Sequence, residues 1–109
     1  VSHYYTLQEA WNTANFGIIE DYLAPGLLKN LQLEREELPA KLDNQVANVA
    51  AEIVRADQSA AVAEISLNFS GSYKDELNGK TGTLNDTWHL ERDLTQANQP
   101  WLIVGIESA

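Results

Sequence analysis

The sequence predicts an α+β fold in which N-terminal helices pack on a twisted, four-stranded antiparallel sheet. Apolar residues recur at helical spacing up to about residue 38, and from residue 46 they alternate with polar residues instead. Short polar turns separate the alternating segments. Helices followed by successive strands with short connections favour an antiparallel meander with the helices on one face.

The first helix is expected to begin near Ser2, because an apolar stripe at helical spacing follows it, formed by Tyr4, Leu7, Trp11 and Ala14. After a break at Asn15, the apolar residues at positions 18, 19, 22 and 23 predict a short second helix. Pro25 suits the first turn of a third helix, where its missing N–H is not needed. Pro39 ends that helix at about residue 38.

The first strand is expected over residues 46–55, with a tight turn at residues 56–59. Its predicted core face consists of Ala47, Val49, Ala51 and Ile53. The second strand, residues 61–73, has the clearest alternation in the chain. Its apolar face carries Ala61, Ala63, Ile65, Leu67, Phe69 and Tyr73, and its polar face carries Glu64, Ser66, Asn68, Ser70 and Ser72. Such alternation predicts one buried and one solvated face.

A hairpin loop at residues 75–82 leads to two closing strands. In the third strand one face carries Leu84, Asp86, Trp88, Leu90 and Arg92, and the opposite face includes His89. In the last strand Trp101, Ile103 and Gly105 alternate with Leu102, Val104 and Ile106. Both faces of this strand are apolar, so we expect both to be covered at its centre.

Composition excludes several classes of function. The 109 residues predict a single domain spanning residues 1–109. The net charge is −9 and the seven basic residues are scattered, which argues against nucleic acid and against attraction to anionic lipid. Cysteine is absent, which excludes disulfides and thiolate metal sites. No apolar run is long enough to span a bilayer.

Three segments resemble the Tim44-like domain, and bacterial members in particular, within the NTF2-like superfamily of α+β folds. They are the aromatic-rich helix around Leu7-Gln8-Glu9-Ala10-Trp11, the segment from Tyr22 through Pro25 to Leu31, and the paired closing strands around Trp88 and Trp101. The family pattern usually has Gly-Asp after the first helix, where this chain has Asn15-Phe16.

The resemblance implies a cone-shaped NTF2-like fold and a membrane-proximal binding or scaffold domain acting in or beside protein translocation at an inner membrane. The chain starts at Val1 with no targeting segment, so we expect a soluble domain excised from a longer protein with an upstream membrane anchor. The expected partner is a protein or a lipid, and no cofactor is expected.

Asp86 is the sharpest catalytic candidate, because it shares the predicted core face with Trp88 and Leu90. A carboxylate facing an apolar cavity can act as a general base. The alternative is a structural carboxylate at the open end of the strand, in water or bonded to a backbone N–H.

A binding pocket between helices and sheet is the second candidate site, because apolar cavities are the usual binding sites of such folds. The residues expected to line it are Trp11, Tyr22, Leu67, Phe69 and Trp88. A completely filled core is the alternative.

The sequence contains no motif for a metal site, a nucleophilic serine or a phosphate-binding loop. The histidines, His3 and His89, show no metal-ligand spacing with carboxylates, and no metal site is expected. Neither a Gly-x-Ser-x-Gly elbow nor a phosphate-binding loop occurs. The acidic residues Glu34, Glu36 and Glu37 could dock a basic partner, although a solvated helix end is the simpler interpretation.

Three functions therefore stay open. The first is a non-enzymatic scaffold that docks a partner in an apolar groove. The second is a small NTF2-like isomerase or hydrolase with Asp86 as its base, which needs a second polar group near that carboxylate. The third is a structural module that associates with itself through the open sheet face, where Asn68, Ser70 and His89 would become protected.

Overall fold

The computed structural model describes residues 2–38 and 42–108. Two α-helices come first, α1 (Ser2–Thr13) and α2 (Pro25–Glu36), with two short 3-10 turns between them, η1 (Phe16–Ile18) and η2 (Glu20–Tyr22). Four strands follow: β1 (Asn44–Gln58), β2 (Val62–Asp75), β3 (Lys80–Asp93) and β4 (Leu102–Ser108). They form one antiparallel sheet in the order β1-β2-β3-β4, so the predicted α+β meander is confirmed.

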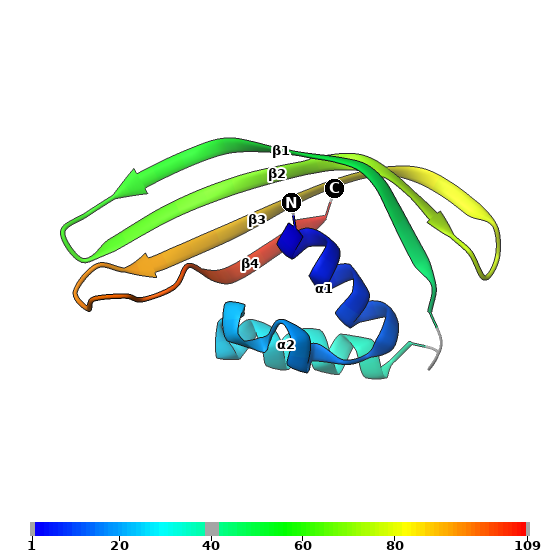
Figure 1. Ribbon diagram of the computed structural model, residues 1–109, viewed down its shortest axis with the longest axis horizontal. Helices are drawn as coiled ribbons and strands as arrows, with labels where there is room; N and C mark the ends of the chain where they lie inside the picture. The colour runs from blue at the N-terminus through cyan, green and yellow to red at the C-terminus, as the bar shows by residue number, and fades with distance from the viewer. Residues whose placement is uncertain (1, 39–41, 109) are drawn as a thin grey trace.

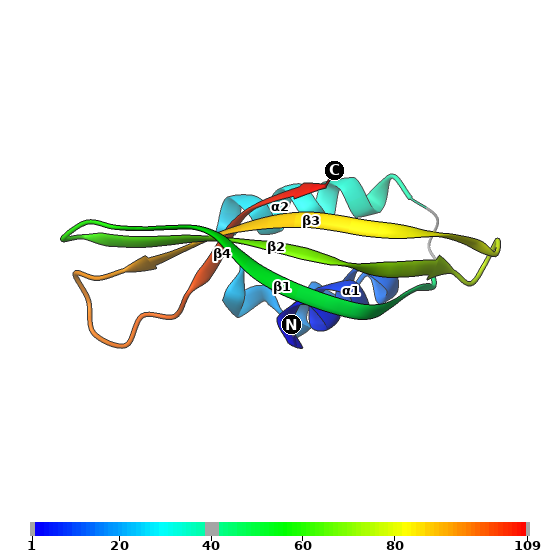
Figure 2. The ribbon, with the colours of Figure 1, turned by 90° about the horizontal axis from the view of Figure 1, so that it is seen from above.

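The sheet arches over the two helices, which lie against the same, concave face (Figure 1). Seen from above, the helices lie under the middle of the sheet, and the hairpin joining β1 to β2 projects beyond them (Figure 2). The molecule is elongated, with extents of 48 × 26 × 19 Å. The end of the sheet at this hairpin is therefore not covered by the helices.

The two α-helices begin where the sequence predicted, at Ser2 and at Pro25. The second predicted helix is wrong, because η1 and η2 replace it with i→i+3 bonds such as Leu23 N–H to the Glu20 carbonyl at 3.2 Å. Leu23 then has extended backbone and forms a parallel bridge with Ile103 of β4. A continuous helix would not leave Leu23 extended, so the sheet contact overrides the local periodicity.

Arg35 fixes the two helices to each other. Its side chain is buried, and its Nε donates to the backbone carbonyl of Trp11 at 2.6 Å. Its guanidinium also donates to the carbonyl of Asn12 at 3.4 Å. A cation at these terminal carbonyls of α1 satisfies acceptors that have no partner within the helix.

The first strand is longer than predicted, and its predicted core face is wrong at Ala47. β1 continues to Gln58, so the residues predicted as a turn are mostly strand. Two residues of β1, Asn48 and Val49, lie opposite the single residue Gly71 of β2 in a β-bulge, and Asn48 has φ 57°. The extra residue shifts the alternation, so Ala47 leaves the face that Val49 occupies.

Gly71 is required at this bulge. A Cβ atom on Gly71 would lie 2.8 Å from the carbonyl oxygen of Ala47 and 3.1 Å from that of Asn48. Backbone atoms of the neighbouring strand cannot move away without breaking the pairing, so a side chain is excluded here.

The last strand also departs from strict alternation. Ile103 pairs with Leu90 and Ile106 pairs with Trp88, which leaves Val104 as the extra residue of a bulge. Ile103 and Ile106 therefore face the helices together, although the sequence predicted opposite faces for them. Ile103 is almost completely buried, with 2% of its surface exposed.

The centre of the core is a group of three aromatic rings from α1, β2 and β3. The Tyr4 ring lies 4.9 Å from the Phe69 ring and 5.4 Å from the Trp88 ring, between centroids. Phe69 and Trp88 are 4.7 Å apart. Such ring pairs add to the apolar area that these side chains bury, and they attach α1 to the middle of the sheet.

Candidate functional site

A groove with a volume of about 780 Å³ lies between the two helices and the concave face of the sheet. Its walls come from α1, α2 and all four strands. Most of its apolar lining is provided by Leu7, Trp11, Leu27, Leu31, Val46, Leu84 and Ile106. The groove exists because the curved sheet departs from the helices on this side, and the core does not fill the space.

The five residues predicted to line a pocket occupy different places. Trp11 and Trp88 line the groove. Phe69 is buried in the core with 2% exposure, and Leu67 is half-buried against that core. Tyr22 is 40% exposed, and its ring lies 4.5 Å from the ring of His3. The structure thus brings the two tryptophans to the groove and places the other three elsewhere.

Asp86 also lines the groove, and it has a polar partner that the sequence did not suggest. The phenol of Tyr4 donates a hydrogen bond to Oδ2 of Asp86 at 2.5 Å. Burial, together with this hydrogen bond and the nearby negative charge, raises the pKa of Tyr4 above its usual value. The pair therefore keeps the proton on the phenol, and Asp86 is the acceptor.

The sequence did not identify Tyr4 as a residue of the site, because its apolar ring accounts for its position in the helical stripe. The chemistry of its hydroxyl group could have identified it. A tyrosine on a buried helix face needs a partner for its hydroxyl, and Asp86 is the one carboxylate on the predicted core face of the third strand.

Among the residues that the structure describes, the charged side chains that line the groove are all acidic. Asp86 at the sheet and Glu34 on α2 line it, whereas no lysine, arginine or histidine does. A ligand with a cationic group is therefore favoured over an anionic one.

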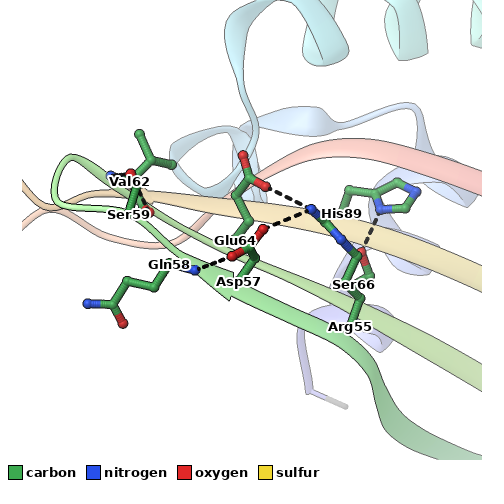
Figure 3. Close-up of polar contacts among 8 residues, drawn as sticks. All are labelled: Arg55, Asp57, Gln58, Ser59, Val62, Glu64, Ser66 and His89. Carbon is green, nitrogen blue, oxygen red and sulfur yellow. Dashed lines mark hydrogen bonds and ion pairs between the residues drawn. The ribbon is translucent and has the colours of Figure 1, made fainter.

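The convex face of the sheet carries a second polar cluster (Figure 3). Ser66 Oγ lies 2.8 Å from Nδ1 of His89, and Nε2 of that ring lies 3.3 Å from Glu107. The order of atoms resembles a serine–histidine–carboxylate set, but Ser66 is only 3% exposed. A substrate cannot reach a hydroxyl buried to this extent, so we assign the cluster a structural role.

Within residues 2–38 and 42–108, no group of three or more histidine or acidic side chains is placed to hold a metal ion. In the same residues no helix has the length and apolar character needed to cross a membrane. Neither a protein-family model nor a curated protein matches this chain in sequence.

Proposed function

We propose that this chain is a non-enzymatic binding domain that docks an apolar segment of a partner protein in the groove between its helices and its sheet. The observation that carries the proposal is the open groove of about 780 Å³ with Trp11 and Trp88 among its lining residues. Concave, largely apolar sites lined by aromatic side chains are where binding energy is usually concentrated.

The charge of the groove supports a protein segment with at least one basic residue as the occupant. Asp86 and Glu34 are its charged lining groups within the described residues, and the whole chain has a net charge of −9. An anionic lipid headgroup would meet carboxylates and no cation there. An apolar helix or strand with a lysine or arginine would place its apolar side chains on the tryptophans and its cation near a carboxylate.

This function agrees with what the Tim44-like resemblance implies, namely a membrane-proximal scaffold linked to protein translocation and built on an NTF2-like cone. The arched sheet with both helices on its concave face supports this part of the proposal. The resemblance rests on the aromatic helix, the segment after Tyr22 and the closing strands around Trp88 and Trp101.

The test is a binding titration with designed amphipathic peptides, followed by NMR and by tryptophan fluorescence. A leucine/lysine peptide is expected to bind and to shift the signals of Trp11 and Trp88, whereas the matched leucine/glutamate peptide is expected not to bind. Glu34→Gln should weaken binding, and Glu36→Gln is the matched control because Glu36 lies on α2 outside the groove lining. Binding of phosphatidylcholine or cardiolipin vesicles in place of either peptide would make the occupant a lipid and contradict the proposal.

A second candidate function is supported by the Tyr4–Asp86 pair. The enzyme alternative needs a second polar group at Asp86, and the Tyr4 phenol is 2.5 Å from it. Asp86 could remove a proton next to a carbonyl, and Tyr4 could donate its hydrogen bond to the oxygen that becomes negative.

This alternative is tested by deuterium incorporation next to the carbonyl of an apolar ketone, followed by NMR. Catalysis predicts incorporation above the buffer blank that disappears in Asp86→Asn and persists in Asp93→Asn, an exposed control on the same strand. Incorporation no faster than the blank would dispose of the enzyme for this class of substrate.

A further inference from the structure

The two edges of the sheet are protected to different extents. At the β4 edge, Leu23 forms a bridge with Ile103, and the N–H of Ala24 donates to the carbonyl of Ile103 at 2.9 Å. At the β1 edge, the side-chain amide of Asn12 bonds both the N–H of Asn44, at 3.1 Å, and its carbonyl, at 2.8 Å. Asn12 thus makes the two hydrogen bonds that a neighbouring strand would make, but only at the first residue of β1.

From Gln45 to Gln58, β1 has β2 as its one strand neighbour among the described residues. Each residue from Ala50 to Gln58 is exposed. Ile53 and Val54 are 62% and 55% exposed, the two highest values among the large apolar side chains described. The end of β1 at the β1–β2 hairpin projects beyond the helices (Figures 1 and 2). A long edge strand with exposed apolar side chains is a template for pairing with another strand.

The charges of this edge complement each other in one antiparallel register. Glu52 pairs with Asn68 and Arg55 pairs with Ser66, with Val54 as the extra residue between them. Because Asn68 and Ser66 share the convex face, the bulge brings Glu52 and Arg55 onto that face as well, although they are three residues apart. A second β1 strand placed with its Val54 opposite Ile53 then puts each Glu52 opposite an Arg55.

The same register also matches the remaining side chains. It places Ala51 opposite Ala56, and these residues lie opposite Phe69 and Ile65 of β2, on the concave face. Small side chains at these positions let the strands approach without a clash. Arg55 is the one basic residue of β1, so this register is the one that places Glu52 opposite a cation. Its present ion pairs with Asp57 and Glu64, both at 3.4 Å, are exposed and therefore weak.

We propose that the chain forms a dimer by antiparallel pairing of β1 with β1 of a second copy, about a two-fold axis between Ile53 and Val54, giving one continuous eight-stranded sheet. The occupant of the edge is a second copy because the edge is self-complementary: each copy returns an arginine to the glutamate of the other. The pairing does not use the groove, so it stands independently of the proposed docking function.

Sedimentation equilibrium over a range of concentrations, at physiological ionic strength, tests this dimer. Glu52→Arg and Arg55→Glu each create two like-charge pairs and are expected to weaken dimerisation by about tenfold or more. The double variant Glu52→Arg/Arg55→Glu exchanges the charges and is expected to restore an affinity within a few-fold of the original. Ile53→Lys should abolish the dimer, whereas Leu33→Lys, at a residue of α2 that is 51% exposed, should leave it intact.

NMR of the unmodified chain against concentration makes the test independent of any variant. Edge pairing requires the amide signals of Ala51 to Ala56 to shift and to gain hydrogen-exchange protection as the concentration rises. A monomer at millimolar concentration would overturn the proposal. So would a dimer that responds to neither charge change, or one that shifts Asn68, Ser70 and His89 and leaves Ala51 to Ala56 unchanged, because the copies would then meet through the convex face.

Discussion

The central strands of the sheet and its β1 edge place apolar side chains in very different environments. At the centre, Phe69 of β2 and Trp88 of β3 are each 2% exposed. At the edge, Ile53 and Val54 of β1 are more than half exposed, although Ile53 lies in the same row across the sheet as Trp88. The Tyr4 ring of α1 packs on Phe69 and Trp88, and the helices leave the side chain of Ile53 on the edge strand in water.

This contrast separates two roles for apolar side chains in one sheet. On the central strands they contribute to folding, because the helices remove them from water. At the β1 edge they add little to folding, and their area is available for association. Truncation of apolar residues that look equivalent in the strand alternation should therefore change the unfolding free energy by very different amounts.

The largest expected effect is at Trp88. Trp88→Ala removes the biggest fully buried side chain of the core and should cost about 3–5 kcal/mol of unfolding free energy, measured by urea denaturation. Ile53→Ala, measured on the monomer, should cost less than about 0.5 kcal/mol, because its side chain is already in water. Equal losses at the two positions would mean that the β1 edge is covered in solution.

The next effect concerns the bulge of β1 at Asn48 and Val49, opposite Gly71. Gly71→Ala places a methyl group 2.8 Å from the carbonyl oxygen of Ala47 and should cost about 1–3 kcal/mol. Gly26→Ala is the matched control, because a Cβ atom there meets nothing within 4 Å, and it should leave stability unchanged or raise it by up to about 1 kcal/mol. Thermal unfolding followed by circular dichroism distinguishes the two. A neutral Gly71→Ala would show that the bulge can be moved.

The order of elements was predictable from the sequence, because it depends on periodicity, and periodicity is local. Periodicity predicted the helix starts at Ser2 and Pro25, and it predicted the four-strand meander. The side-chain faces of β1 and β4 were not predictable, since each bulge at Asn48, Val54 or Val104 reverses the alternation beyond it. A bulge depends on the partner strand, and strict alternation contains no signal for it.

The candidate site was predictable in part for a related reason. Asp86 and Trp88 were assigned to the helix-facing side of the third strand, and the structure places both at the groove. Their partner Tyr4 is 82 residues away from Asp86 in sequence, so no spacing rule links the two. The extent of the groove depends on how far the sheet arches from the helices, which is a property of the assembled fold.

The smallest expected effect tests how tightly α1 is held to the central strands of the sheet. Tyr4→Phe keeps the ring against Phe69 and Trp88 but removes the hydrogen bond to Asp86, and should cost about 1 kcal/mol at pH 7. Tyr5→Phe, at the neighbouring exposed tyrosine, is the control and should cost nothing measurable.

The pH dependence of the same variant gives a sharper readout. Because the pKa of Tyr4 is raised in the folded state, both states hold its proton below about pH 10, the usual value, and this group adds no pH dependence there. Above that pH the unfolded phenol ionises first, so the unfolding free energy should fall with rising pH by about 1.4 kcal/mol per pH unit from this residue. Tyr4→Phe should remove that part of the alkaline slope, and Tyr5→Phe should keep it. An unchanged slope in Tyr4→Phe would mean that the phenol is hydrated, and that α1 separates from the sheet at this end of the groove.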